Sequence, residues 1–182
     1  MVKRLLLLIF LFLASTSERA EGAASRALSL EELTERADLI AHIRVVGERS
    51  RFEGERIVTE IDLVVERSIA DIASRRELRV IVPGGVVGGI GMRVEGAPRL
   101  AKGEEAVVFA FESARGLRTV GLAQGVFPIE RRGEERLVLP GGRGMALYER
   151  GPSGRLMRTK SAIDAPMPLG GFISLIEQEL ER

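Results

Sequence analysis

Over most of the chain, hydrophobic residues alternate with polar ones at the period of two that marks β-strands. The clearest run covers residues 57–65, where Ile57 and Ile61 share one face while Glu60 and Asp62 lie on the other. The same pattern predicts further strands at residues 39–46, 78–82, 106–111, 117–122, 126–129 and 137–139. Turns separate these segments, and no strand–helix–strand alternation occurs, so the pattern indicates an antiparallel sheet.

Helical spacing occurs near both ends of this strand-rich region. Ser29 and Glu32 form a capping box that predicts a short helix over about residues 30–36. Near the C-terminus an apolar stripe at helical spacing predicts an amphipathic helix: Leu169, Phe172, Ile173, Ile176 and Leu180. The predicted fold is therefore mainly β, a small antiparallel barrel of OB or netrin-like type with a short N-terminal helix and a C-terminal helix that closes it.

The first 24 residues have the organisation of a secretory signal peptide. Lys3 and Arg4 precede an apolar run over residues 5–14, and small residues follow at 22–24. That run is about half of the roughly 20 apolar residues that a membrane-spanning helix needs. The sequence thus predicts export to the periplasm or the medium, without a stable membrane anchor. After the signal peptide, 1–24, we expect a barrel domain at 25–140, a loop or partly flexible segment at 141–168, and the helix at 169–182.

Composition removes several classes of function. The 182 residues include one His and no Cys or Trp, which excludes a Cys nucleophile, an iron–sulfur cluster and disulfides, and leaves too few ligands for a structural zinc site. Without residues 1–24, the chain keeps 27 minus 3 basic and 26 minus 2 acidic residues, which is 24 of each. A neutral chain with 4% aromatic residues lacks both the basic face and the stacking platforms of nucleic-acid binding. We expect no cofactor, no metal and no nucleic-acid partner.

Few side chains are candidates for catalysis. His42 has no Gly-x-Ser-x-Gly nucleophile motif to accompany it, so we interpret it as a surface or packing residue of a strand. The adjacent carboxylates Glu31–Glu32, Glu104–Glu105 and Glu134–Glu135 fall at a helix start or in polar turns, where carboxylates are normally solvated. The sequence therefore favours a protein that is not an enzyme.

The glycine-rich segment at residues 83–91 is the least ordinary part of the chain. It has neither the Lys nor the hydroxyl residue of a P-loop, and its glycines do not open a helix as a dinucleotide fingerprint does. We interpret it as a wide loop with exposed apolar side chains, which suits a docking surface. Together with a second short segment it supplies these candidate interaction residues: Gly84, Gly85, Val86, Val87, Gly88, Gly89, Ile90, Ala123, Gln124 and Gly125.

A spaced set of motifs runs through residues 28–130. It comprises Ala37-Asp38-Leu39-Ile40, Pro83-Gly84-Gly85, Gly88, Gly91, Val94-x-Gly96-x-Pro98, Gly103-Glu104 and Gly121-Leu122-Ala123-Gln124-Gly125-x-Phe127. This set resembles the pattern of a group of uncharacterised exported bacterial proteins, which supply no activity to transfer. The order of helix, Ala-Asp, strand and hairpin is more distantly similar to netrin-like domains, the OB-type barrel of tissue inhibitors of metalloproteinases. Those inhibitors bind zinc through an N-terminal Cys, so the resemblance implies barrel geometry only.

These observations predict a non-enzymatic, exported protein-binding module whose partner is another exported protein, with a peptidase as one candidate. Two alternatives stay open. One is an inhibitor or accessory factor of an exported metalloprotease, which rests on the resemblance in fold. The other is an enzyme with an unorthodox carboxylate–Arg site, which would require a buried glutamate with a raised pKa in a deep pocket.

Overall fold

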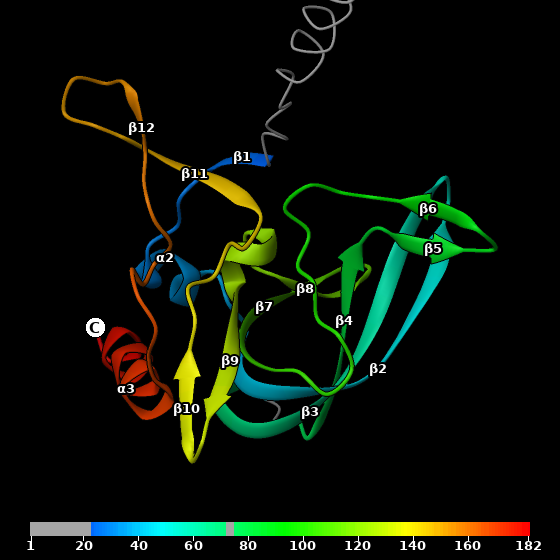
Figure 1. Cartoon of the computed structure of the whole chain (residues 1–182), viewed down its shortest axis with the longest axis horizontal. Coiled ribbons are helices and arrows are strands. Elements are labelled where there is room, and N and C mark those ends of the chain that lie inside the picture. The colour runs from blue at the N-terminus through cyan, green and yellow to red at the C-terminus, as the bar shows by residue number, and fades with distance from the viewer. Residues whose placement is uncertain (1–22, 72–74) are drawn as a thin grey trace, which may run out of the picture.

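The computed structural model describes residues 23–71 and 75–182 and is mainly β, with antiparallel-rich sheets and two α-helices (Figure 1). The elements of the N-terminal half are β1 (Ala23–Arg26), α2 (Leu30–Glu35), β2 (Leu39–Glu53), β3 (Arg56–Asp71), β4 (Glu77–Pro83), β5 (Gly85–Val87) and β6 (Ile90–Met92). Those of the C-terminal half are β7 (Glu105–Ser113), β8 (Gly116–Thr119), the 3-10 helix η1 (Leu122–Gly125), β9 (Val126–Arg132), β10 (Glu135–Val138), β11 (Met145–Arg150), β12 (Leu156–Arg158), β13 (Met167–Pro168) and α3 (Leu169–Leu180).

The largest sheet has eight strands in the order β13-β10-β9-β7-β2-β3-β4-β8. An additional pairing joins β7 to β8, so the hydrogen-bonded neighbours lead from β7 through β2, β3, β4 and β8 back to β7. Every pairing in this ring is antiparallel except β4 with β8, where Val80 lies opposite Leu117 in a parallel bridge. The prediction of a mainly β, largely antiparallel chain is confirmed.

One buried cluster lies on the face that alternating residues of the ring strands share. It contains Leu39, Ala41, Ile43, Val45, Ile61, Leu63, Leu78, Val80, Val82, Leu100, Ala106, Val108, Ala110, Leu117 and Val126. The period-two pattern produces most of this cluster, since every second side chain of a strand points to the same side. Leu100 of the loop before β7 and Val126 of β9 join it from outside the ring. We call it the inner core.

A second buried cluster occupies the opposite face of β2 and β7 and is covered by helices. It contains Leu28, Leu33, Ile40, Val107, Phe109, Val120, Phe127, Val138, Ile163, Phe172 and Ile176. We call it the outer core. Residues of β2 and β7 such as Ile40 and Phe109 are fully buried here while their neighbours are buried in the inner core. These two strands therefore separate two hydrophobic layers.

Both predicted helices are present, and their contacts refine the prediction. Ser29 accepts from the backbone N–H of Glu32, and the Glu32 carboxylate accepts from the backbone N–H of Ser29, so the capping box is confirmed. In α3 the apolar stripe buries Phe172, Ile173 and Ile176. The helix covers the outer core beside β10 and does not lie across an opening of the strand ring (Figure 1).

Residues 141–168, for which we expected a loop or partly flexible segment, contain β11, β12 and β13. The partner of β11 is β1, aligned parallel with it from Ala23 opposite Met145 to Arg26 opposite Tyr148. No local sequence pattern predicts such a pairing, because the two strands are more than a hundred positions apart in the chain. Residues 1–22 of the expected signal peptide lie outside the described residues, whereas Ala23 and Ala24 belong to β1. Among the residues with described structure, no helix is long and apolar enough to cross a membrane.

Candidate functional site

The candidate residues 84–90 form most of a two-stranded hairpin rather than the wide loop we expected. In it β5 pairs with β6, with Val86 opposite Gly91 and Val87 opposite Ile90. Val86 and Ile90 are 65% and 61% exposed, among the most exposed large hydrophobic residues of the described chain. The hairpin lies at the edge of the molecule, on the far side from the β11–β12 hairpin (Figure 1).

A chain of hydroxyl hydrogen bonds ties this hairpin to β2 and β3. The Thr59 hydroxyl donates to the Gly84 carbonyl at 2.7 Å and lies 2.9 Å from Ser50 Oγ. Because the proton of Thr59 is used on Gly84, Ser50 must donate to Thr59, and Ser50 Oγ in turn accepts from the Val86 N–H at 3.3 Å. The backbone N–H of Gly84 also donates to the Ile57 carbonyl at 2.8 Å. The base of the hairpin is therefore fixed to the two longest strands.

Gly85 makes this close attachment sterically feasible. Its φ is +138°, and a Cβ at this position would overlap both Ser50 Oγ and Thr59 Oγ1. Only glycine combines that backbone conformation with that approach at low cost. The glycine pair that stood out in the sequence thus serves the anchoring of the hairpin, while Val86 and Ile90 supply its exposed apolar surface.

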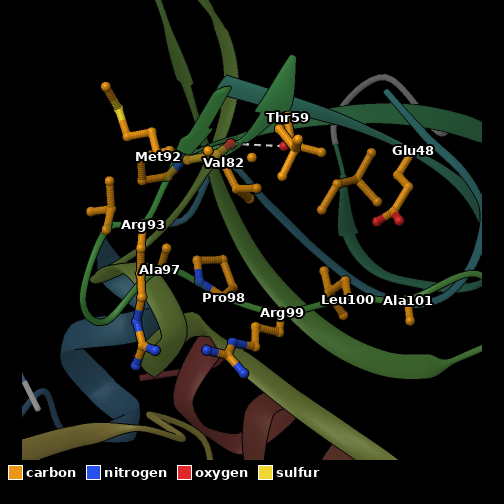
Figure 2. A pocket seen from close by; sticks show the side chains of 17 residues that line it. Glu48, Thr59, Val82, Met92, Arg93, Ala97, Pro98, Arg99, Leu100 and Ala101 are labelled. Carbon is orange, nitrogen blue, oxygen red and sulfur yellow. Dashed lines mark hydrogen bonds between the residues drawn. The ribbon is translucent and has the colours of Figure 1, made fainter. Parts of the chain in front are cut away.

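A cavity of about 690 Å³ opens beside the hairpin. Apolar side chains of Ile61, Val82 and Leu100 are among its lining residues. Arg93 and Arg99 also line it, and Figure 2 shows their guanidinium groups pointing the same way from the loop after β6. The dashed line in that view is the hydrogen bond from Thr59 to Gly84.

The other three candidate residues do not join the hairpin surface. Ala123, Gln124 and Gly125 form η1 and are buried. The Gln124 side chain accepts from the Leu28 N–H at 2.9 Å and donates to the Arg26 carbonyl at 3.1 Å, so it holds the segment before α2 in place. Ala123 touches the loop after β6 through its N–H, which donates to the Gly96 carbonyl at 3.0 Å. Their burial makes them supports of the fold rather than a contact surface.

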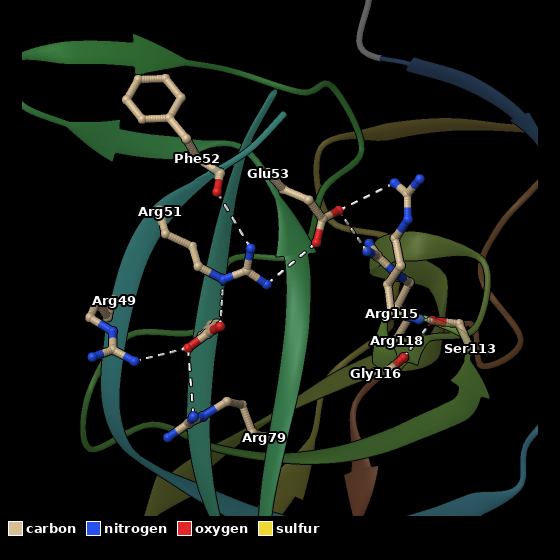
Figure 3. A network of polar contacts seen from close by, with 10 residues as sticks. Arg49, Arg51, Phe52, Glu53, Arg79, Ser113, Arg115, Gly116 and Arg118 are labelled. Carbon is tan, nitrogen blue, oxygen red and sulfur yellow. Dashed lines mark hydrogen bonds and ion pairs between the residues drawn. The ribbon is translucent and has the colours of Figure 1, made fainter. Parts of the chain in front are cut away.

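Beside the hairpin, the exposed face of β2, β3 and β4 is covered by matched charges (Figure 3). Glu60 accepts from Arg51 at 2.6 Å and from Arg49 at 3.2 Å, and these hydrogen bonds lower its pKa. At the tip of the β2–β3 ribbon, Glu53 pairs with Arg115 and Arg118 at 3.4 Å each. Such pairing leaves few free charges on this face.

Phe52, at that same tip, is 49% exposed. Its ring lies near the β5–β6 hairpin in Figure 3, and β2 and β5 are joined by the hydrogen bond from Val86 to Ser50. Together Phe52, Val86 and Ile90 form what we call the apolar tip. An apolar tip next to a charge-matched sheet face is the most distinct feature of this end of the molecule.

A second polar site lies on the outer face of β2 and β7, and the sequence analysis missed it. His42 and Glu105 are only 3% and 8% exposed, and His42 Nε2 lies 3.1 Å from Glu105 Oε2. Arg131 of β9 donates to the other oxygen of Glu105, and Arg136 Nε of β10 lies 3.8 Å from Oε2. His42 and both arginines line a cavity of about 820 Å³, which the first turn of α3 also borders.

The protonation states in this cluster follow from burial and pairing. Burial lowers the pKa of His42 and outweighs the opposing effect of Glu105. Burial by itself would raise the pKa of Glu105, but hydrogen bonds from Arg131 and His42 lower it below its usual value. At neutral pH Glu105 is therefore ionised and His42 is neutral. An ionised carboxylate only accepts, so the imidazole proton is on Nε2 and Nδ1 is an unprotonated acceptor.

Our expectation that Glu105 lies in a solvated turn was wrong. It opens β7 in phase with Val107 and Phe109, and His42 is in phase with Ile40; all of these point to the outer core. The phase could be seen in the sequence, but the helices that bury this face could not. Among the described residues no Ser or Thr lines the cavity, and no group of three or more potential ligands is placed to hold a metal ion.

Comparison of the chain with protein-family models, with curated proteins and with solved structures finds no match.

Proposed function

We propose that this chain is a non-enzymatic, exported protein-binding module that contacts another exported protein through its apolar tip. The observation that carries the proposal is the exposure of Val86 and Ile90 on a hairpin with a rigid base. These apolar side chains are exposed but held on a fixed backbone. Their burial against a partner lowers the free energy, because it removes apolar surface from water. The charge-matched face around them adds little attraction of its own, so the apolar contact dominates.

We also propose that the strand ring is an OB-type barrel of the netrin-like kind. Support comes from five strands whose pairings return to their start, and from the parallel contact between β4 and β8. A five-stranded barrel of this type presents its connecting loops from a rigid frame. The β5–β6 hairpin is an insertion between two of those strands, β4 and β7.

The test is a double substitution, Val86→Asp with Ile90→Asp, in a tagged protein used to capture proteins from the exported fraction of its own cells. Two carboxylates at the tip add the cost of burying unpaired charge in any apolar interface. We expect the specific partner to be lost, with binding weakened by more than about 100-fold.

The matched control is Leu156→Asp with Met157→Asp on the β11–β12 hairpin, where the two side chains are 68% and 47% exposed. This variant makes the same chemical change on the opposite side of the molecule and should keep the partner. If the variant at the apolar tip retains every partner that the unchanged protein captures, the proposal is wrong.

The enzyme alternative has one supporting and one opposing observation. Glu105 is a buried carboxylate beside arginines, as that alternative requires. Its pKa is lowered rather than raised, because the hydrogen bonds from Arg131 and His42 outweigh burial, so it does not hold a proton to donate at neutral pH. The role of inhibitor or accessory factor of a metalloprotease is a narrower form of the binding proposal, with a peptidase as the partner.

A further inference from the structure

The cavity above His42 carries both signs of charge in equal number. Three arginines and three glutamates line it: Arg67, Arg131, Arg136, Glu66, Glu134 and Glu135. Several already have partners, since Arg67 pairs with Glu177 at 2.9 Å and Glu66 with Arg44 at 2.7 Å. Within the described part of the chain, the one ion pair of Arg136 is the long contact to Glu105 at 3.8 Å, and Glu134 and Glu135 make no ion pair.

Arg136, which is only weakly paired, and the two unpaired glutamates suit a ligand with two opposite charges better than a simple ion. An anion placed near Arg136 would be repelled by Glu134 and Glu135, and a cation near those carboxylates would be repelled by Arg136. A molecule that carries both charges can place its anionic group near Arg136 and its cationic group near Glu134 and Glu135. The local balance of charge therefore selects a zwitterion.

The floor of the cavity offers a buried acceptor. His42 is 3% exposed and lines the cavity, and its only hydrogen bond in the described structure is the one from Nε2 to Glu105. Nδ1 consequently has no partner, yet it is not among the atoms closed off from solvent. A bare imidazole nitrogen at the bottom of a cavity accepts from an N–H or O–H donor of a ligand.

The wall of the cavity offers donors and an apolar strip. The helix α3 begins after Pro168 with no side chain capping its first turn, and Leu169 and Gly170 line the cavity. The N–H groups of an uncapped first turn are free to donate, and the positive end of the helix favours a carboxylate. Leu169 and Ile173 add an aliphatic surface on the same side.

We propose that this cavity binds an α-amino acid with an aliphatic side chain. The carboxylate accepts from Arg136 and from the first-turn N–H groups of α3. The ammonium donates to His42 Nδ1 and lies near Glu134 and Glu135. The side chain packs on Leu169 and Ile173. This inference does not depend on the proposed function, because the cavity is on the outer core and the apolar tip is on another part of the molecule.

The test reads the imidazole directly by nitrogen-15 NMR. His42 is the only histidine, so its two ring nitrogens are assigned without a variant. We expect L-leucine to shift the Nδ1 resonance of the purified protein in a saturable manner. Sodium acetate and methylammonium chloride, which each carry one of the two charges, should bind at least about tenfold more weakly, because each forgoes one set of charge-assisted hydrogen bonds. Equal binding of acetate, or no shift with leucine, overturns the proposal.

A pair of glycine substitutions separates binding from folding. A side chain at Gly170 would meet nothing within 4 Å, so Gly170→Leu fits the helix and fills the cavity mouth. Gly171→Leu makes the same change one residue later. Gly171 does not line the cavity, and a Cβ there would be 3.5 Å from Met167. We expect the first variant to lose leucine binding by more than about tenfold while both fold as stably as the unchanged protein. Retained binding in Gly170→Leu contradicts the assigned site.

Discussion

At the scale of single residues, the pair His42–Glu105 places two titratable side chains in a buried position. Burial of a polar side chain that makes no hydrogen bond is destabilising because the side chain is desolvated, and burial of an ionised carboxylate is more so. Glu105 offsets this penalty with Arg131 and His42, and His42 offsets it by staying neutral. At neutral pH the pair therefore consists of an ionised Glu105 and a neutral His42.

This state predicts acid sensitivity of the fold. Because the pKa of His42 is lowered in the folded protein, the unfolded chain binds a proton first as the pH falls below about 6.5. The free energy of unfolding is therefore highest above that pH, as far as His42 is concerned, and decreases as the pH falls toward the pKa of His42 in the folded protein. The pKa of Glu105 is also lowered, so protonation of this carboxylate decreases the free energy of unfolding further at more acid pH. Urea unfolding at a series of pH values measures it.

His42→Gln is the control for this prediction, because its amide can donate to Glu105 and does not titrate. The charged groups that face His42 from other elements are unchanged in this variant: Glu66 and Arg67 of β3, Glu105 of β7, Arg131 of β9 and Arg136 of β10. The slope of stability with pH between about 7.5 and 5.5 should flatten in this variant. An unchanged slope would assign the acid sensitivity to another group.

At the scale of elements, α3 is anchored to the sheet by the aromatic contacts of Phe172, on its buried face. Phe172 packs against Phe127 with ring centroids 4.8 Å apart and against Phe109 at 6.5 Å. All three rings are fully buried in the outer core. Close-packed aromatic clusters of this kind contribute both apolar burial and favourable edge contacts. The helix thus acts as a cover for β7 and β9 rather than as an independent element.

Phe172→Ala should lower the free energy of unfolding by about 3–5 kcal/mol, since it removes a fully buried ring and leaves a cavity between two others. Leu175→Ala on the same helix is the control; this side chain is 37% exposed, and its loss should change stability by less than about 1 kcal/mol. Chemical denaturation of both variants measures the difference. Equal effects would mean that α3 is not anchored by its aromatic face.

At the scale of the whole molecule, β2 and β7 connect two hydrophobic layers. Leu39 and Ala41 belong to the inner core, while Ile40, between them, belongs to the outer core. Neither layer can lose its packing without exposing one face of the shared strands. The two layers are consequently coupled through the backbone of β2 and β7.

This coupling predicts one cooperative unfolding transition. Amide signals of β4, which contributes to the inner core, and of α3, which contributes to the outer core, should disappear at the same urea concentration within experimental error. Phe172→Ala should shift both signals together. Separate midpoints for the two elements would show that the outer layer unfolds alone.

The amino-acid sequence by itself determined what depends on neighbours in the chain. The alternation over residues 57–65, the capping box at Ser29 and the apolar stripe of α3 are local patterns, and each produced the expected element. The exposure of Val86 and Ile90 was also expected, because a glycine-rich segment between strands has no apolar face to bury.

Only the tertiary structure decided which surfaces meet. The pairing of β1 with β11, the burial of Glu105 beside His42 and the support given by Gln124 to the segment before α2 all join residues far apart in the chain. Alternation assigns a side chain to a face of a strand, but it does not say whether water or a helix lies over that face. For β2 and β7 a helix does, and this turns two ordinary polar positions into a buried polar site.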